Sequence, residues 1–325
     1  MTVTLPAVPG YPLLGAALAS AGLTIGDVVH VTEYVTAGAS PDVLASARAA
    51  VFAGHLVPVS RVPVAALLDG ADHAVEVTAH YGGGALLTAG ADVVRVADGV
   101  VYLPSVHTAE GDFREQYRRC LARIVELLAV AGLDTGALVR TVDYTSTATR
   151  AEYPRCGRPR REALGAGPVH PGAAGILVDV PVAPGAAVSL DALAATAPLR
   201  VLNPGWARYD TLTYKPAVQA GKTVYLAGFG ALDPVGQRAL HDGDLAAQTA
   251  FVYRSIETVL AVAGGTGEHV THVVEYLTPD AVPSYAGTRA LREEHFPNAT
   301  FTSVVCSALL RPEFLIETVP TAVLP

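Results

Sequence analysis

An internal repeat constrains this chain more than any other feature of its sequence. Residues 16–36, 126–146 and 258–278 align without a gap. Each stretch contains Ala-Gly, then ten residues, then an acidic residue followed by tyrosine, and then one residue and a hydroxyl side chain. The acid–tyrosine pairs are Glu33-Tyr34, Asp143-Tyr144 and Glu275-Tyr276. A fixed pattern of this kind indicates copies of one supersecondary unit, so we expect three related segments.

The hydrophobic pattern predicts the same elements in each segment. Apolar residues recur at intervals of three and four before each Ala-Gly, which predicts an amphipathic helix that ends at the glycine. The residues after it alternate between apolar and polar, which is typical of a strand. A second helix is predicted over 41–55, 149–164 and 283–296. Each segment is then predicted to end in two further strands. Their ranges are 60–67 and 73–80, 175–182 and 187–193, and 301–309 and 314–319.

Two of the segments have an additional hairpin before their first helix. These hairpins are predicted over 93–104 and 214–228, with turn residues Asp98-Gly99 and Gly221-Lys222. The first segment is expected to start directly at its helix. We therefore predict an α+β fold of three units: segment one (residues 1–82, truncated), segment two (83–195) and segment three (196–325).

Segment three carries the most specific motifs. They are Tyr214–Gly221, Leu226–Phe229, Leu232–Pro234 and the strand Arg311–Glu317. These motifs resemble those of the reactive intermediate deaminase family (Rid, or YjgF), whose fold resembles chorismate mutase. The resemblance covers residues 210–320 well, 93–193 more weakly and 16–80 only in part. Because family members are generally homotrimers with ligand sites between subunits, the resemblance implies a monomeric pseudo-trimer, or at most a weak dimer.

The resemblance also implies a chemistry and a catalytic pair. The family hydrolyses enamines or imines derived from amino acids, using an arginine that binds the substrate carboxylate and a glutamate fifteen residues later. In segment one, Arg61 and Glu76 have this separation. Segment three keeps the acid as Glu317, but the arginine position falls on Phe301 or Thr302. Segment two has Ala173 at that place and at best Asp191 as the acid, so we expect one competent site rather than three.

Other side chains are candidates for binding the substrate. They are Tyr214, Lys215, Gly228, Phe229, Thr302, Cys306 and Arg289. Lys215 replaces a serine of the family and is either solvated, a ligand for an anion, or a Schiff-base amine. Cys306 is either a small buried hydrophobe or a nucleophilic thiolate, which requires a lowered pKa.

Composition narrows the remaining possibilities. The net charge is −8 and the basic residues are scattered, so nucleic acid is not an expected partner. No apolar run reaches the ~18 residues that cross a bilayer, and no secretory signal precedes the first motif, so a cytoplasmic protein without membrane contact is expected. Three distant cysteines favour reduced thiols. Neither His-Glu-x-x-His nor a glycine-rich nucleotide motif occurs, so we expect no metal and no cofactor.

Three functions remain open from the sequence. The first is a hydrolase or deaminase, expected to be a tailoring enzyme of specialised metabolism, that uses general acid–base catalysis on a small carboxylate-bearing imine, enamine or related molecule. The second is a chorismatase-like hydrolase, since chorismatases resemble linked Rid units, although Leu310 stands where some of them have cysteine. The third is a binding protein or scaffold with degenerate sites.

Overall fold

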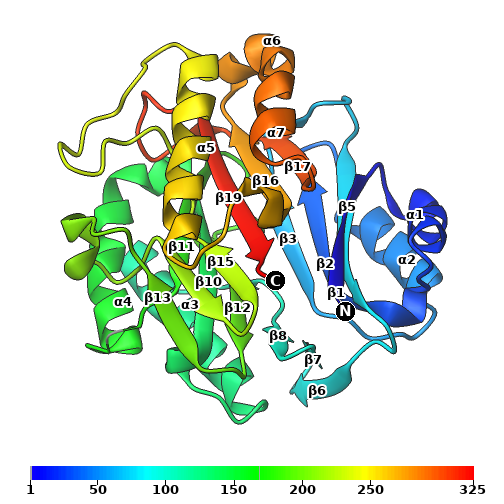
Figure 1. Ribbon diagram of the computed structural model, residues 1–325. Coiled ribbons are helices and arrows are strands. Elements are labelled where there is room, and N and C mark those ends of the chain that lie inside the picture. Colours follow the sequence, from blue (N-terminus) through cyan, green and yellow to red (C-terminus); the bar gives the residue numbers. More distant parts are fainter. Residues whose placement is uncertain (1, 168) are drawn as a thin grey trace.

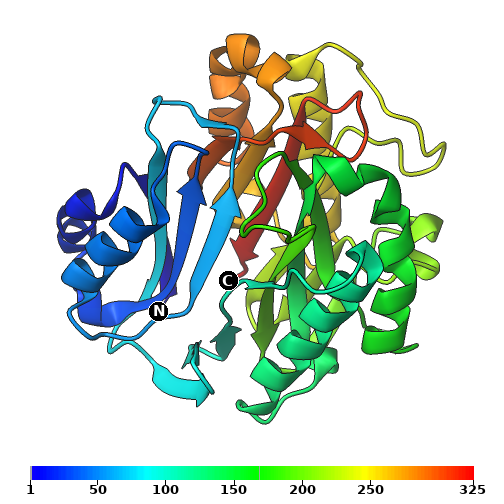
Figure 2. The ribbon, with the colours of Figure 1, turned by 180° about the vertical axis from the view of Figure 1, so that it is seen from behind.

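The computed structural model describes residues 2–167 and 169–325, and their strands form three sheets around the middle of the molecule (Figures 1 and 2). Segment one contributes β1 (Thr2–Val8), α1 (Leu14–Ser20), β2 (Val28–Val35), α2 (Pro41–Phe52), β3 (Val59–Pro63), β4 (Ala66–Leu67) and β5 (His73–His80). Its own sheet has the order β1-β5-β2-β3. The helices lie on the outer side of this sheet (Figure 1).

Segment two follows with a longer series of elements. They are β6 (Ala85–Ala89), β7 (Asp92–Ala97), β8 (Val100–Tyr102), β9 (Val106–His107), α3 (Phe113–Ala129), β10 (Leu138–Ser146), the 3₁₀ stretch η4 (Thr147–Cys156), α4 (Gly157–Leu164), β11 (Gly172–Val178) and β12 (Val188–Ala195). The strands form the sheet β18-β11-β10-β12-β8-β7-β6, in which β18 comes from segment three.

Segment three completes the molecule. Its elements are β13 (Leu199–Leu202), η5 (Ala207–Asp210), β14 (Ala217–Ala220), β15 (Thr223–Leu226), α5 (Leu245–Ala261), β16 (Val270–Leu277), α6 (Val282–Tyr285), η8 (Ala286–Thr288), α7 (Arg289–His295), β17 (Thr300–Val305), β18 (Ala308–Leu309) and β19 (Ile316–Val323). The sheet order is β13-β14-β15-β19-β16-β17-β4, so β4 of segment one joins it.

The same pairing recurs in all three segments. The strand after the first helix pairs in parallel with the next strand and antiparallel with the last one: β2 with β3 and β5, β10 with β11 and β12, β16 with β17 and β19. The prediction that segment one starts at its helix is wrong, because β1 precedes it and pairs with β5. The predicted second helix is continuous only in α2. In segment two it is divided into η4 and α4, and Pro154 lies inside η4. In segment three it is divided into α6, η8 and α7.

Each segment contacts the next in a ring. Leu67 of β4 pairs with Val304 of β17, which joins segment one to segment three. Leu309 of β18 pairs with Ile176 of β11, which joins segment three to segment two. The ring closes where the Ser105 amide donates to the Val59 carbonyl at 3.2 Å, between segments two and one.

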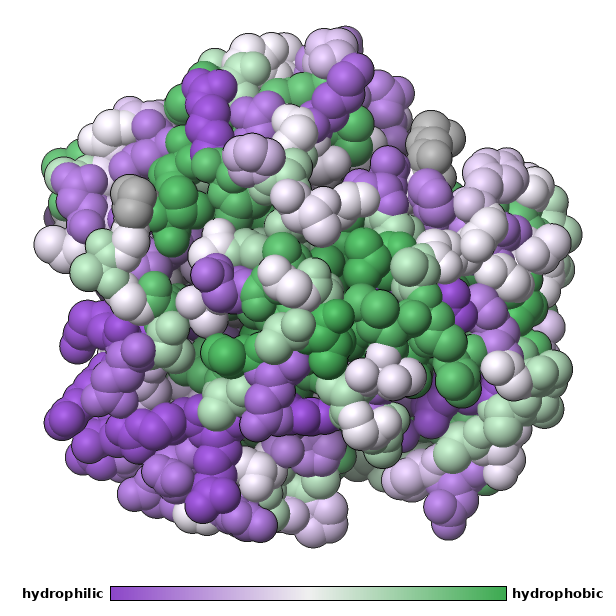
Figure 3. All heavy atoms as spheres, turned by 90° about the horizontal axis from the view of Figure 1, so that it is seen from below, coloured by the Kyte–Doolittle hydropathy of each residue, from purple (hydrophilic) through white to green (hydrophobic). Residues whose placement is uncertain are grey.

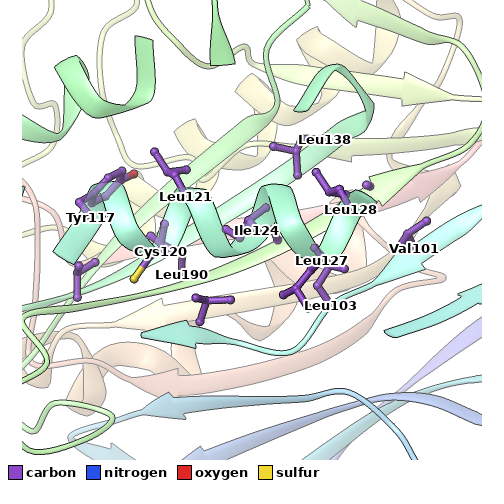
Figure 4. Close-up of a cluster of buried hydrophobic side chains, with 14 of the residues drawn as sticks. Val101, Leu103, Tyr117, Cys120, Leu121, Ile124, Leu127, Leu128, Leu138 and Leu190 are labelled. Atoms are coloured by element: carbon purple, nitrogen blue, oxygen red, sulfur yellow. The ribbon is translucent and has the colours of Figure 1, made fainter. Parts of the chain in front are cut away.

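Helix packing forms separate cores on the outer faces of the sheets. Figure 4 shows the one beneath α3, where Tyr117, Cys120, Ile124 and Leu127 point toward the sheet that carries Leu190. The inner faces share another core, in which the tyrosines of the repeated motif meet: the Tyr144 and Tyr276 hydroxyls are 2.8 Å apart.

The surface is mixed in polarity. Seen from below, apolar side chains gather in the middle of the face and the most hydrophilic ones lie toward one edge (Figure 3). No helix of the described residues is long and apolar enough to cross a membrane.

Candidate functional site

The expected pair of Arg61 and Glu76 does not form. Arg61 is opposite Glu33 in the β2–β3 ladder, whereas Glu76 is opposite Thr32 in the β2–β5 ladder. Paired residues share a face of the sheet and neighbours along a strand alternate, so the two side chains point to opposite faces. Arg61 lies on the helix side, where its Nε is 3.4 Å from Glu33. The expectation that these two residues hold and hydrolyse a substrate together is therefore corrected.

Glu76 instead joins an inner contact between segments one and three. Its Oε2 is 3.0 Å from Nε2 of His272, and both side chains are nearly buried. Burial alone would raise the pKa of Glu76, but the charge and hydrogen bond of His272 and a hydrogen bond from Thr302 outweigh burial and lower it. Glu76 is thus an ionised and partnered carboxylate.

The same register shows what occupies the inward position next to each central strand. Ser60 is opposite Thr32, Ala174 is opposite Val142, and Thr302 is opposite Val274. None of these three positions is an arginine, so the carboxylate fork that the resemblance implies is missing from every segment. In segment two the inward residue is Ala174 rather than Ala173.

Glu317 has different surroundings from Glu76. It lies on β19 opposite Tyr276, at the contact between segments three and two. Its Oε1 accepts a long hydrogen bond of 3.4 Å from the Gly175 amide of β11. A Cβ on Gly228 would stand 2.1 Å from the same Oε1 and 2.7 Å from the Ala174 Cβ, so only glycine fits there. We define the Glu317 site as Glu317, Gly228, Ala174, Gly175 and Cys306.

Electrostatics distinguish this carboxyl group. Glu317 is only 6% exposed, and burial raises its pKa to about 8, with the Gly175 hydrogen bond as the only opposing effect. No cation among the described residues contributes to the shift. The carboxyl is therefore mostly neutral at pH 7 and can donate a proton.

Cys306 is part of this site but is not activated. It is fully buried, and its Sγ donates to the Leu277 carbonyl at 3.3 Å. Burial, together with the charge of Glu317, raises the pKa of the thiol to about 12. A nucleophilic thiolate needs the opposite shift, so the geometry supports the interpretation of a small buried hydrophobe.

The remaining predicted binding residues are dispersed. Phe229 packs in the core beneath α5, and Arg289 forms an exposed ion pair with Glu293 at 2.7 Å. Thr302 lies between segments one and three, where its hydroxyl accepts from the Ala7 amide at 3.2 Å. These three are corrected as members of one site with Glu317.

Tyr214 and Lys215 lie at the start of the segment-three hairpin. The Tyr214 hydroxyl accepts from Arg208 at 3.1 Å, and its ring meets that of Tyr209 edge-on at 5.6 Å. Lys215 is buried and its Nζ donates to the Tyr209 carbonyl. Tyr209 was not among the predicted site residues. Burial raises the pKa of its hydroxyl to about 12, and the charges of Tyr214 and Glu317 add to this shift.

The acid of the repeated motif is structural in all three segments. Glu33, Asp143 and Glu275 point under the helices and accept from Tyr11, Tyr117 and Tyr253 at 2.6, 2.6 and 2.5 Å. Arginines approach each of them: Arg48 and Arg61, Arg160, and Arg292. The acid of the motif thus links a helix to the central strand of each sheet through a hydrogen bond.

Two hollows lie between segments. One of about 560 Å³ is lined by Arg161, the 165–167 loop, His170, Asp210–Thr213 and Lys215, and is next to the hairpin that carries Gly228. The other, of about 190 Å³, lies between segments one and three, with Ala74, Leu68 and Thr302 in its wall. Among the described residues, no group of histidine, cysteine and acidic side chains has the arrangement of a metal site.

Known proteins resemble this chain in sequence and in fold. A family model described as Endoribonuclease L-PSP matches residues 208–324. The 3-aminoacrylate deaminase RutC of Acinetobacter baylyi is 34% identical over 105 residues, which are 32% of this chain and 81% of the relative. The chain belongs to this family, the Rid (YjgF) family. The Glu317 site takes Glu317, Gly228 and Cys306 from the matched part and Ala174 and Gly175 from outside it.

Solved structures extend the similarity of fold. A chorismatase crystal structure superposes with a TM-score of 0.64 at 15% identity, covering 91% of this chain and 93% of that one. YyfA of Yersinia pestis, described as a member of the conserved Rid protein family, covers 39% of this chain and 99% of its own, with a TM-score of 0.34 and 19% identity. The chorismatase similarity therefore spans all three segments in an α+β fold.

Proposed function

We propose that this protein is a hydrolase of small carboxylate-bearing molecules with an electron-rich double bond, and that Glu317 is its general acid. The observation that carries the proposal is the burial of the Glu317 carboxyl group with a single long hydrogen bond. This burial raises the pKa of Glu317 to about 8. A buried acid of this kind matches the need for a proton donor at neutral pH.

The proposed reaction starts with an enamine or enol ether. Glu317 donates its proton to the carbon end of the double bond, which leaves an iminium or oxocarbenium ion. Water then adds to that cation while the Glu317 carboxylate takes the proton that water loses. The adduct collapses to a carbonyl compound and releases ammonia or an alcohol, and the carboxyl group is again protonated.

The relatives' names support this class of substrate. RutC is named for 3-aminoacrylate, an enamine that carries a carboxylate. The chorismatase is named for chorismate, which contains an enol ether, and its similarity extends over 91% of this chain. This coverage favours chorismatase-like hydrolysis as the second candidate. Loss of the fork arginine from the inward positions Ser60, Ala174 and Thr302 argues against the general deamination of amino-acid intermediates and for a tailoring step in specialised metabolism.

We further propose that the three segments are degenerate copies of one Rid-like unit and act as a pseudo-trimer within one chain. The recurring strand pairing and the ring of contacts support this arrangement. The chain then needs no further subunits to form the contacts between segments. Light scattering should give a mass near that of one chain, 33.5 kDa, and a stable homotrimer would contradict the proposal.

The functional test is a comparison of two isosteric variants. Enzymatically generated 3-aminoacrylate and chorismate are incubated with the protein, and released ammonia and pyruvate are measured. Glu317→Gln should reduce turnover by about 10²–10⁴-fold, because Gln cannot donate the proton. Glu76→Gln is the matched control and should keep the rate per folded molecule.

The other outcomes are equally informative. If Glu76→Gln alone abolishes turnover, Glu317 is not the acid. If the wild-type protein binds these molecules tightly without converting them, the chain is a binding protein.

A further inference from the structure

The larger hollow contains two nearly buried polar side chains. Lys215 is 9% exposed and His170 is 8% exposed, and both line this space of about 560 Å³. Arg161, which is exposed, and the backbone of residues 165–167 form the rim. Such burial of polar groups is costly unless they are paired.

The ammonium of Lys215 is incompletely paired. Its Nζ donates one hydrogen bond, to the Tyr209 carbonyl, and an ammonium has three donors. No salt bridge to Lys215 is formed within residues 2–167 and 169–325. A buried cation in this state favours an anionic partner.

Other side chains that line the hollow also favour an anionic ligand. Nε2 of His170 lies 3.2 Å from the Gly165 carbonyl, and its buried Nδ1 has no partner among the described residues. On α4, Arg158 pairs with Glu162 and Arg160 approaches Asp143, whereas Arg161 forms no ion pair in the described part of the chain. Asp210 also lines the hollow, but it is exposed to solvent.

We propose that this hollow binds an oxyanion, the carboxylate of the substrate, through Lys215 and Arg161, with His170 contacting the same group or a neighbouring hydroxyl. It would thus replace the fork arginine that is missing from the inward positions Ala174 and Thr302. In this form the inference rests on the proposed function, but the anion site itself can be tested without turnover.

The hollow and the Glu317 site are neighbours along segment two. The Lys215 amide donates to the Pro171 carbonyl and the Gly228 amide donates to the Ala173 carbonyl, each at 3.0 Å. The two anchor points are two residues apart on segment two, which corresponds to about 7 Å of extended chain. We therefore place the substrate carboxylate at Lys215 and its double bond on the side of the hollow that is nearer the Glu317 site.

The experiment uses the fact that Lys215 and Lys222 are the only lysines of the chain. The full chain is labelled with [¹³Cε]lysine and titrated with sodium acetate and, separately, with sodium phosphate at constant ionic strength. We expect a saturable shift of the Lys215 signal with acetate. Lys222, which is exposed in the hairpin turn, should show no saturation.

Variants separate the anion site from catalysis. Lys215→Met should weaken acetate binding at least tenfold, and Lys222→Met should leave it unchanged. Arg161→Gln alters an exposed residue, so the fold should persist while binding weakens three- to tenfold. Glu317→Gln should still bind acetate, which tests the site even if Glu317 is not the acid.

Three results would overturn the proposal. One is a Lys215 signal that does not saturate with either anion, and another is unchanged binding in both Lys215→Met and Arg161→Gln. The third is saturation with phosphate but not with acetate, which would assign the hollow to a phosphate group and reject the substrate carboxylate.

Discussion

Glu76 and Glu317 are each 6% exposed, and each lies on the inner face of the last strand of its segment. Their pKa values nevertheless shift in opposite directions, lowered for Glu76 and raised to about 8 for Glu317. Glu76 faces His272 from another segment, whereas Glu317 faces the small residues Gly228 and Ala174. Burial is the same in the two places, so the partner decides the charge.

This comparison distinguishes a carboxylate with a charged or hydrogen-bonding side-chain partner from a buried carboxyl group without one among the described residues. The contact between Glu76 and His272 joins segments one and three, and removing His272 leaves the Glu76 carboxylate buried without this partner. Glu317 has no such partner to lose and remains poised as a neutral acid. The two contacts therefore differ: Glu76 has a side-chain partner from another segment, whereas Glu317 is the carboxyl group that we propose as the general acid.

The largest expected effect is on stability at the Glu76 contact. His272→Leu removes the imidazole partner of the Glu76 carboxylate but keeps that carboxylate buried beside Thr302 and His30. This change should lower the free energy of unfolding by about 3–5 kcal/mol. Urea unfolding at pH 7 measures this change in the free energy of unfolding. The double variant His272→Leu/Glu76→Gln should recover part of the loss, and full additivity of the two single changes would show that the pair is not coupled.

The next effect is a dependence of stability on pH that has opposite signs at the two glutamates. Glu317 has a folded pKa of about 8, above its usual 4.5. Between these values the unfolded chain loses the proton and the folded chain keeps it, so this group makes the protein less stable as pH rises, by up to about 4 kcal/mol. Glu317→Gln should therefore be increasingly more stable than wild type from pH 5 to pH 8, as measured by urea unfolding at each pH.

Glu76 provides the reciprocal control. Its folded pKa is lowered, so the stability it contributes is present above its unfolded value and is lost as pH falls through the folded one. Glu76→Gln should be less stable than wild type at neutral pH, with the difference disappearing in acid. Parallel pH profiles for the two variants would show that the carboxyls have the same environment.

A smaller effect is expected from filling the space beside Glu317. Gly228→Ala places a Cβ against the Glu317 carboxyl and the Ala174 side chain, so the carboxyl must move. We expect a loss of about 1–3 kcal/mol in stability and a large fall in turnover. Gly287→Ala is the control, since nothing lies within 4 Å of its added Cβ, and normal activity in Gly228→Ala would remove the Glu317 site from catalysis.

The sequence predicted the elements better than the contacts between them. Hydrophobic periodicity located the repeated strands, and the Arg311–Glu317 motif indicated Glu317. The separation of fifteen between Arg61 and Glu76 was misleading, because a shift of one residue in register places a side chain on the other face of a sheet. His272, 196 residues from Glu76, could not be identified as its partner, since only the ring of segments brings them together.

The smallest effect is expected at Cys306, which shares the Glu317 site. With a pKa raised to about 12, its thiol is almost entirely protonated at pH 7.5, so it is a poor nucleophile. Cys306→Ala should change turnover by less than about threefold and lower the free energy of unfolding by roughly 1 kcal/mol, because a small buried group is lost. Steady-state rates and urea unfolding give both quantities. If Cys306→Ala instead abolishes turnover as fully as Glu317→Gln, the thiol attacks the substrate, and Glu317 then acts as the base that takes its proton.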